Sequence, residues 1–557
     1  MPHIAVIGSR SPKARLGIAA IYAVLLLGAI TTVYPFLLMV ATGMKGQNDY
    51  NDFTPGALVP RYLYDDAALF QKYAEDKYAN NLDDTNAAYN TAFPEPKSIV
   101  PPKENADPAL LTSWADFQKT LPAAERKTGF GEHDGAPSLL LLRYRAWLRA
   151  RFGDDIVSLN KAYTEESVGF DTVAPPFERT ALRDWKPELT KPKVRDWYEF
   201  RKTLPDHMLV TRTADPAYRA WLRQDVYEES LPALNAAWGT TYTDWSQIIL
   251  PRTAIGNTEQ RNDWMTFVIR KLPVDMVTTD NPATASSTVG VISLLAANTP
   301  ENRWRALPDV PDDAAPPQAQ LDREYVQTHK DDLRRDFASR NFRTVFDYIF
   351  LHGSAVPNTI VFCVLAIVSA VIVNPLCAYA LSRYPLPYAY QVLLFLLATM
   401  AFPAEVAMIP NFLLLRDLGM LNTFWALILP GIANGFAIFL LKGFFDSLPK
   451  ELYEAAILDG ATEIGMFRTI TVPLSLPIFS VIALNAFTAS YGAFLFAMVV
   501  CQDPKMWTLM VWLYDLQATA PQYVIMAALT LAALPTLIIF MFAQKIIMRG
   551  IILPSFK

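Results

Sequence analysis

Residues able to carry out chemistry are few and scattered in this chain of 557 residues. No two of its five histidines have metal-ligand spacing, so the sequence predicts no metal site. They are His3, His133, His207, His329 and His352. No G-x-x-x-x-G-K-[ST] phosphate loop occurs, so the chain is not expected to hydrolyse nucleotides by that route. The sequence therefore predicts no catalytic residue.

One carboxylate lies inside a long apolar run. Glu405 interrupts residues 384–417 between Pro403 and Pro410, two prolines that indicate a broken or kinked helix. If the run crosses a membrane, such an acid is a functional candidate by default and could line or gate a solute path. The equally weighted alternative places Glu405 near the outer interface, solvated beside a broken helix.

Residues 451–477, ELYEAAILDGATEIGMFRTITVPLSLP, separate two apolar runs. Pro449 suits the first turn of a helix, and Glu451 favours its positive end. Gly460 permits the left-handed conformation that ends a helix, and a second short helix can then run towards Pro473. One face of the first helix would carry Leu452, Ala455, Ala456 and Asp459. We expect a bent pair of short helices that docks on another surface.

The composition favours a membrane protein. The chain is 52% hydrophobic and 18% charged. Six apolar runs each exceed the roughly 20 residues that span a bilayer as a helix. They cover residues 16–44, 353–382, 384–417, 421–441, 469–502 and 516–544. We predict six transmembrane helices. Tyr491 and Phe494, in the fifth, could also face a solute path, although aromatic residues in a span more often pack.

Basic residues on the short flanks predict the orientation. Those at positions 10–15, 383, 442–468 and 545–557 would all fall on one side of the membrane. The positive-inside rule places both termini and residues 446–473 in the cytoplasm. The first run is longer than a secretory h-region and lacks a clear cleavage site, so we interpret it as an uncleaved anchor. Residues 45–340 are then extracytoplasmic, and the net charge of −5 argues against nucleic acid as a partner.

The block of residues 45–340 contains a threefold repeat of about 74 residues. Helical spacing within each copy predicts a helix, a short turn, a helix, an extended stretch into proline and another helix. The three cysteines lie in or beside the apolar runs, so the block has no disulfide. Matching positions are Asn86, Asn160 and Asn235, then Tyr89, Tyr163 and Trp238, then closing pieces that begin at Trp114, Trp197 and Trp264.

Nine of the 12 tryptophans lie in this block, which allows two interpretations. They could be platforms on which sugar rings stack, or they could form the core of the repeat. Equivalent positions favour the core, so we expect Trp147 and Trp221 to pack where neighbouring copies stack. The stretch LNAAWGTTYTDWSQIILP resembles a short part of some β-galactosidase-like glycosidases. It brings no identifiable pair of catalytic acids, so we do not infer hydrolysis.

The segment around Gly460 resembles the signature of a known family. The segment is similar to the EAA motif of ABC importer permeases. That motif is Glu-Ala-Ala, three residues, Gly, nine residues, and Ile-x-Leu-Pro, and Val472 stands here in place of the leucine. The matching residues are Glu454, Ala455, Ala456, Gly460, Ile470 and Pro473. Residues 16–45 and 341–551 also resemble the smaller, maltose-type permease subunit of carbohydrate importers. ASYGAFLF stands where that family commonly has Trp-Asn, and the usual glycine-rich tail is replaced by ILPSFK.

The resemblance implies an all-α permease of six transmembrane helices with a mainly α-helical insertion. Residues 1–15 would be a cytoplasmic tail, 16–44 the first span, 45–340 the insertion and 341–557 the permease core. The chain would be a transport subunit and not an enzyme. In the family, the elbow formed by residues 446–473, Asp459 included, is the coupling helix that docks on the ATPase.

The partners implied are a second homologous permease subunit, two ABC ATPase subunits that bind ATP, and an extracytoplasmic solute-binding protein. The chain itself would hold no cofactor, and its location would be the bacterial cytoplasmic (inner) membrane. Alternatives are a permease for a solute other than a sugar, or a membrane-anchored protein that binds or processes glycans through the repeats.

Overall fold

The computed structural model describes residues 12–51, 58–103, 139–176, 188–211, 215–251, 256–272, 318–347, 354–399 and 403–550, apart from residues 90, 92 and 168, together with short pieces between 108 and 127. The chain divides into two compact units. The first comprises residues 1–44 and 339–557, and the second comprises residues 45–338. Each unit is described by itself.

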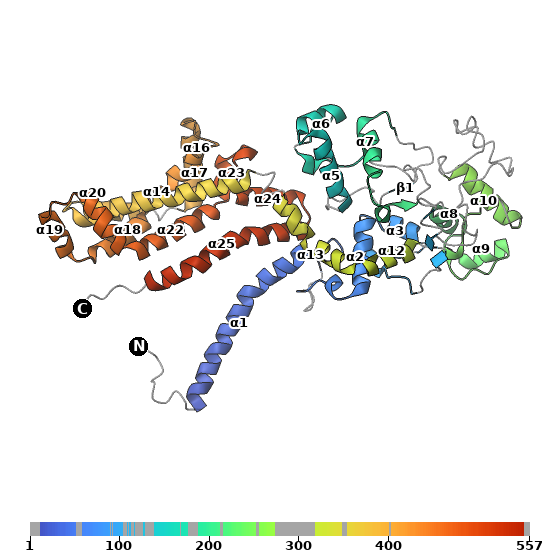
Figure 1. The fold of residues 1–557 in the computed structure, drawn as a ribbon, viewed down its shortest axis with the longest axis horizontal. Coiled ribbons are helices and arrows are strands. Elements are labelled where there is room, and N and C mark those ends of the chain that lie inside the picture. The colour runs from blue at the N-terminus through green and yellow to red at the C-terminus, as the bar shows by residue number, and fades with distance from the viewer. Residues whose placement is uncertain are drawn as a thin grey trace. The chain divides into compact units, whose positions relative to one another are not determined.

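The first unit is built from helices (Figure 1). Its long helices are α1 (Pro12–Gly43), α14 (Ala355–Arg383) and α25 (Gln522–Gly550). Shorter ones are α15 (Ala389–Thr399), α16 (Ala404–Asp417), α17 (Phe424–Ile428), α18 (Gly435–Asp446), α19 (Lys450–Leu458), α20 (Glu463–Met466), α21 (Val472–Leu474), α22 (Leu476–Tyr491), α23 (Leu495–Val500) and α24 (Leu509–Thr519). The helix α13 (Lys330–Phe346) contains the boundary between the two units.

Three helices of the described residues are long and apolar enough to cross a membrane without a break. They are Arg15–Gly43, Ala355–Arg383 and Gln522–Gln544, which lie in the first, second and sixth predicted spans. Two further candidates are bent pairs, Phe424–Gly431 with Gly435–Asp446 at 54° and Glu463–Leu474 with Leu476–Tyr491 at 84°. The fold is therefore that of an α-helical membrane protein with up to five candidate spans by this measure.

The six continuous helices predicted from the sequence are not confirmed. Residues 384–417 form two helices, α15 and α16, and Pro403 is the N-cap of the second. Both are shorter than the roughly 20 residues that a span needs. The fourth predicted span is broken before Asn434, whose side chain accepts a hydrogen bond from Ala437 N and caps α18. The fifth is broken at Ser475 and ends at Tyr491.

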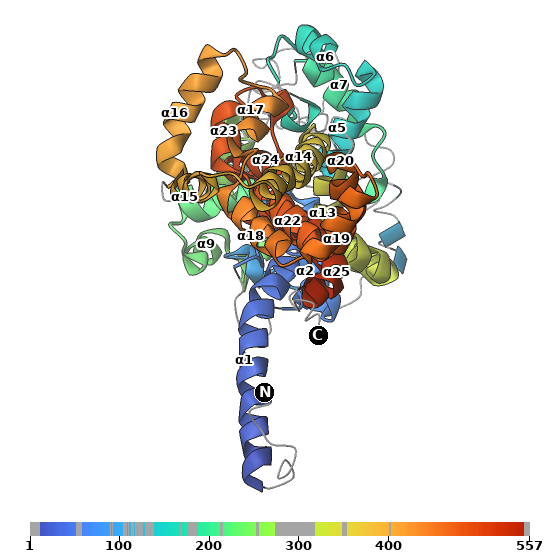
Figure 2. The ribbon, with the colours of Figure 1, turned by 90° about the vertical axis from the view of Figure 1, so that its left-hand side faces the viewer.

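The helix α14 is the centre of the first unit. It packs against α18 and α22, and α22 packs against α25 (Figures 1 and 2). Buried Asn374 on α14 accepts a hydrogen bond from Asn434 N at 2.8 Å, which joins α14 to the break before α18. Gly435 lies so close to the carbonyl of Leu396 that a Cβ atom would meet it at 2.4 Å, so α15 and α18 can approach only because this residue is glycine.

The second unit is also mainly helical. Its helices are α2 (Asp66–Lys77), α3 (Leu82–Tyr89), α5 (Leu139–Phe152), α6 (Ile156–Tyr163), α7 (Pro192–Arg201), α8 (Asp215–Trp221), α9 (Leu231–Trp238), α10 (Thr258–Arg270) and α12 (Gln318–Thr328). Two strands of two residues each, β1 (Arg126–Lys127) and β2 (Val210–Thr211), pair antiparallel. Arg126 lies opposite Thr211 and Lys127 opposite Val210.

The three asparagines that recur in the sequence make the same hydrogen bonds. Asn86, Asn160 and Asn235 each donate from the side-chain amide to the carbonyl of the residue seven positions later. The amide oxygen of each asparagine accepts from the N–H of that same residue. This pair of bonds closes the turn after the second helix of each copy, and it satisfies both backbone groups of the turn residue.

Each copy has a separate hydrophobic core. One gathers around Leu69, Phe70 and Tyr78, one around Tyr144, Leu148 and Trp197, and one around Tyr218, Leu222 and Trp264. The expectation that neighbouring copies share one stacked core is therefore wrong for the described residues. The reason is that a third helix packs over the first two helices of each copy and covers their apolar faces. In the second and third copies this helix belongs to the copy itself.

The tryptophans of the second and third copies are core residues, as expected, but to unequal degrees. Trp197 and Trp264 on the third helices are 1% and 2% exposed. Trp147 and Trp221 on the first helices are only partly buried and pack against the edge of their clusters. The most deeply buried tryptophans are thus those of the closing pieces.

The first copy is closed by a helix from far along the chain. Asp196 on α7 accepts a hydrogen bond from Tyr163 Oη, and Asp263 on α10 accepts one from Trp238 Nε1. The equivalent aromatic of the first copy, Tyr89, donates to Asp322 on α12 at 2.9 Å. The buried residues four positions after these aspartates are Phe200, Phe267 and Val326. The predicted closing piece at Trp114 lies outside the described residues, and α12 fills this place on the core.

Candidate coupling segment

The helix α19 begins where the sequence predicts. Pro449 is its N-cap, Glu451 lies in its first turn, and the helix runs from Lys450 to Leu458. Proline fixes φ near the helical value and lacks an N–H, so it costs little at a helix start. The carboxylate of Glu451 lies at the positive end of the helix dipole, where it is favourable.

Gly460 ends α19 in the conformation expected from the sequence. Its φ is +79°, a left-handed value, and its N–H donates to Ile457 O at 3.0 Å. The next N–H, of Ala461, donates to Ala456 O at 2.9 Å. These two bonds form a Schellman turn, which a residue with a Cβ atom adopts only with strain. Thr462 then caps α20 by accepting from Gly465 N at 3.2 Å.

Tyr453 anchors α19 to the rest of the unit. It is 6% exposed, and its hydroxyl lies 2.8 Å from Thr471 Oγ1, which is fully buried. The guanidinium of Arg383, at the end of α14, lies 3.7 Å from the centre of the Tyr453 ring. Close cation–π contacts of this kind hold a ring in one orientation. The same arginine donates to Phe445 O at 2.6 Å, so the ends of α14, α18 and α19 meet around Tyr453.

Glu463 makes a second tie to α14. Tyr379 donates a hydrogen bond from its hydroxyl to Glu463 Oε2 at 3.1 Å, and its ring packs edge-on against Phe467 at 5.2 Å. These contacts join α20 and the π-helical turn Phe467–Thr471, which precedes α21 and α22, to α14.

The outer face of the segment is apolar and exposed. Leu458 is 88% exposed and Ile464 is 79% exposed, on either side of the turn at Gly460. Ile457 and Leu452 are also exposed, at 58% and 44%. In Figure 1, α19 and α20 lie at one end of the helices of the first unit, and α23 and α24 lie towards the other end. A small apolar knob that projects from one end of a bundle is suited to binding in a cleft of another protein.

The structure places most of the predicted coupling residues on this projecting elbow. Glu454, Ala455, Asp459 and Gly460 are exposed, whereas Ala456 and Ile470 are half-buried and pack against the cluster that contains Tyr453. Pro473 is exposed at the start of the short helix α21. The seven residues thus belong to one continuous structure, and its contact with an ATPase stays a prediction.

The predicted path residues are not brought together. Glu405 is exposed in the first turn of α16, and Pro403 and Pro410 are exposed on the same element. Tyr491 is 7% exposed, and its hydroxyl donates to Ala532 O on α25 at 2.5 Å. Phe494 packs against Tyr514 with ring centres 4.9 Å apart. Tyr491 and Phe494 therefore pack within the unit, and a solute path lined by Glu405, Tyr491 and Phe494 stays a prediction.

Sequence reasoning missed Tyr453, Thr471 and Arg383. The sequence contains a clue for Tyr453, because it is the one aromatic residue of ELYEAAILDG. Arg383 carries no such clue, since its contact depends on how α14 ends beside α19.

The first unit is thus a helical membrane unit with an exposed apolar elbow, α19 and α20, at one end. Residues 337–553 match the family described as "Binding-protein-dependent transport system inner membrane component". The "Polygalacturonan/rhamnogalacturonan transport system permease protein YtcP" of Bacillus subtilis (strain 168) is 30% identical over 238 residues, which are 40% of this chain and 82% of that protein. The chain therefore belongs to this family and is a transport subunit, not an enzyme.

A second curated relative agrees with this assignment. The "Maltodextrin transport system permease protein MdxG" of Bacillus subtilis (strain 168) is 32% identical, over 38% of this chain and 77% of that protein. A chain from a solved structure, "Crystal structure of a bacterial ABC transporter involved in the import of the acidic polysaccharide alginate", is 26% identical with a TM-score of 0.33, over 37% of this chain and 78% of that chain.

The second unit has a different relationship. Residues 204–281 match the family described as "Beta-galactosidase", which extends the short resemblance seen in the sequence. Two carboxylates in this stretch, the buried Asp215 and the half-buried Asp263, are occupied in holding the fold. Asp215 accepts from Leu250 N at 2.8 Å, and Asp263 accepts from Tyr227 Oη at 2.6 Å as well as from Trp238. Neither is placed as half of a catalytic acid pair in an open cleft.

Proposed function

We propose that the chain is the carbohydrate-translocating permease subunit of an ABC importer. The observation that carries this proposal is the elbow of α19 and α20, with exposed Leu458 and Ile464 on either side of the Gly460 turn. A sugar is supported as the solute by the names of relatives, which transport polygalacturonan and rhamnogalacturonan, maltodextrin and galactooligosaccharides.

The elbow would bind in a cleft of an ABC ATPase subunit, which binds and hydrolyses the ATP. When two such subunits close, α19 is pushed, and the contacts of Tyr453 with Thr471 and Arg383 carry the motion to α22 and α14. Because those contacts are buried, the elbow moves with the spans instead of bending alone. The outcome is alternating access of the solute path, in which Glu405 is the candidate gating residue.

A second, homologous permease subunit would complete the path. Its presence is supported by α1, because the most apolar 18-residue window within Arg15–Gly43 has no residue buried in this chain. Among the described side chains of this helix, only Ala41, Thr42 and Gly43, at its end, are buried. The chain would lie in the bacterial inner membrane with both termini in the cytoplasm, as the basic flanks indicate. The three-copy insertion would then be extracytoplasmic, where a solute-binding protein can dock on it.

The test is ATPase stimulation in the assembled transporter. The chain would be purified with the subunits that copurify, reconstituted, and assayed with a panel of binding proteins and sugars. The expected result is that one combination of binding protein and carbohydrate stimulates ATP hydrolysis and uptake. Stimulation only by solutes that are not sugars would overturn the carbohydrate assignment and keep the permease.

A second candidate function rests on the match of residues 204–281 to β-galactosidases. A membrane-anchored glycan-binding or glycan-processing protein would bind or cleave glycans with no ATPase subunit present. Release of sugar from a β-galactoside by the purified chain alone would favour this function over transport.

A further inference from the structure

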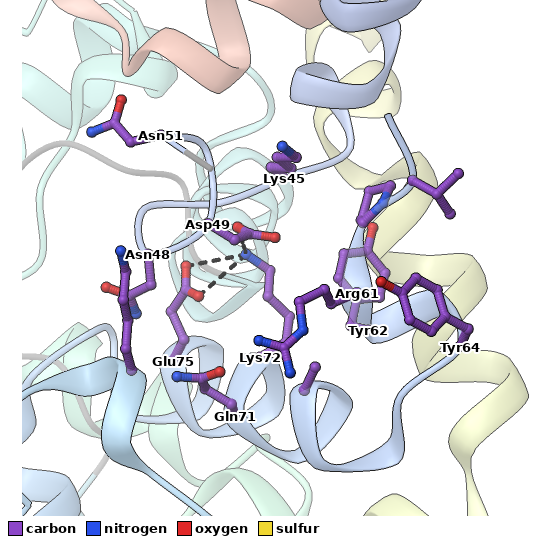
Figure 3. Close-up of a pocket in the computed structure, with 14 residues that line it drawn as sticks. Lys45, Asn48, Asp49, Asn51, Arg61, Tyr62, Tyr64, Gln71, Lys72 and Glu75 are labelled. Carbon is purple, nitrogen blue, oxygen red and sulfur yellow. Dashed lines mark hydrogen bonds and ion pairs between the residues drawn. The ribbon is translucent and has the colours of Figure 1, made fainter. Parts of the chain in front are cut away.

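A polar pocket lies at the beginning of the second unit. Its cavity volume is about 310 Å³, near the lower end of the roughly 300–1,000 Å³ that small-molecule sites occupy. Four parts of the chain form it: residues 45–51, residues 59–64, one face of α2 and Lys97. We call it the Lys72 pocket, after the residue at its centre (Figure 3).

The floor of the Lys72 pocket is a rigid network of charges. Lys72 Nζ lies 3.4 Å from Asp49 Oδ1 and 3.1 Å from Glu75 Oε1, and Figure 3 shows the three side chains meeting there. Gly46 N donates to Asp49 at 2.6 Å, and Gln47 N donates to Glu75 at 2.9 Å. Because side chains and backbone are joined, the oxygens of Asp49 and Glu75 are held in place before any ligand arrives.

The rim carries cations whose charge faces water. Arg61 is 64% exposed, and its partner Asp65, at 2.9 Å, is 30% exposed. Exposed pairs of this kind are weak, so the guanidinium can bind an anion at little cost. Lys97 is a second exposed cation on the rim. The pocket is lined by four cationic side chains and two carboxylates, so a negative ligand is favoured.

The rim also carries an aromatic face. Tyr64 is 64% exposed, although it follows directly on the 3₁₀ turn that contains Arg61 and buried Tyr62. Tyr64 and Arg61 line the same pocket, so one small site offers an apolar ring face and a planar hydrogen-bond donor for an anion. A saccharide ring with a carboxylate group presents the complementary features: an apolar ring face, hydroxyl groups and a planar anion.

We propose that the Lys72 pocket binds one sugar residue of an acidic saccharide, with the carboxylate on Arg61, the ring face on Tyr64 and hydroxyl groups donating to Asp49 and Glu75. The proposal rests on the proposed function, since it names the class of carbohydrate that the insertion recognises. Recognition at this site would collect acidic saccharides beside the transporter. It does not require the pocket to be part of the translocation path.

The experiment measures binding of trigalacturonate to the complete chain, purified with its copurifying subunits in lipid nanodiscs at 150 mM salt. Neutral maltotriose is the matched ligand without carboxylates. The variants are Arg61→Gln and Tyr64→Ala. Arg223→Gln is the control, because Arg223 also pairs with an exposed acid, Glu229, but lies outside the pocket. All variants are first shown to melt at the wild-type temperature.

We expect trigalacturonate to bind at least about tenfold more tightly than maltotriose, because only trigalacturonate has a carboxylate that can form a charge-assisted hydrogen bond with Arg61. Arg61→Gln should weaken trigalacturonate binding about tenfold and Tyr64→Ala about fivefold, whereas Arg223→Gln should leave it unchanged. Equal binding of the two trisaccharides, or unchanged binding by Arg61→Gln, would overturn the proposal. Sugar-stimulated ATPase in the same preparation is a separate readout, so the transport function can stand while the pocket proposal fails.

Discussion

The hydroxyl groups of Tyr453 and Thr471 lie 2.8 Å apart in the interior of the first unit, although Thr471 comes 18 positions after Tyr453 in the chain. This bond closes the elbow into a loop that begins and ends on the same buried contact. Any force applied to the exposed turn at Gly460 therefore reaches the start of α22 through two routes, the backbone and this bond.

Removing the Tyr453 hydroxyl should loosen the elbow without unfolding it. Tyr453→Phe keeps the ring under Arg383 and deletes the bond, which is expected to cost about 0.5–1.5 kcal/mol of stability. Uptake should fall more than ATP hydrolysis, because closure of the ATPase is then transmitted less faithfully. Thr471→Val and the double variant complete a cycle. A coupling energy of zero between the two positions would refute a direct role for the bond.

Gly460 should tolerate alanine poorly and proline not at all. Proline cannot adopt the φ of +79° and lacks the N–H that donates to Ile457 O. Alanine keeps the N–H and meets no neighbouring atom, so its cost is only the strain of a left-handed residue, about 1–2 kcal/mol. We expect Gly460→Pro to insert into the membrane and fail to couple ATP hydrolysis to uptake, with Gly460→Ala intermediate. Wild-type uptake by well-expressed Gly460→Pro would remove the coupling role.

The elbow contains one feature that the sequence predicts and one that it does not. Gly460 was predictable because a left-handed residue at a helix end is a local requirement, visible in the spacing from Pro449 to Pro473. The contact between Tyr453 and Arg383 was not, since it depends on the packing of two distant helices. The role of α12 was also not predictable, because it depends on contacts with residues far away in the chain. The stretch LDREYVQTHK, which covers most of α12, has no local feature that marks it as the helix that closes the first copy of the repeat.

The separate cores predict unequal costs for tryptophan substitutions. Trp197→Ala removes a side chain that is 1% exposed, and truncations of this kind cost about 3–5 kcal/mol. Trp147→Ala removes a half-buried ring at the edge of the same cluster and should cost clearly less. Thermal melting followed by circular dichroism compares the two variants in the complete chain. Equal losses would contradict the packing described here, and loss of sugar binding without loss of stability would restore the platform interpretation of Trp147.

His207 should make the second unit sensitive to acid. Burial, with Lys77 and Arg143 nearby, lowers the pKa of His207 from its ordinary value of 6.5 to about 4, against the opposing effect of Asp322. The unfolded chain therefore takes up a proton between pH 6.5 and 4 that the folded chain does not, so stability falls as the pH falls through this window. The ring is stacked on Tyr325, with centres 4.3 Å apart.

The expected acid effect is about 1 kcal/mol, because His207 is only half-buried and water screens part of the interaction. His207→Gln should flatten the dependence of melting temperature on pH between 6.5 and 4. Comparison of the two proteins at pH 8, where His207 is neutral in both states, measures the separate cost of losing the stacked ring. An unchanged slope in His207→Gln would show that other groups cause the acid sensitivity.

The helix α12 is predicted to be essential for the first copy of the repeat, because it supplies a buried acid. Lys77 Nζ lies 2.5 Å from Asp322 Oδ1, and the side chains are 2% and 3% exposed. Tyr78 also donates to this carboxylate, at 3.0 Å. Removing one partner of a buried pair leaves an uncompensated charge, so Lys77→Met should cost about 3–5 kcal/mol. Lys202→Met is the control, because Lys202 pairs with exposed Glu199. This variant should melt at the same temperature as the wild type. If Lys77→Met and Lys202→Met melted alike, α12 would not be the helix that closes the first copy.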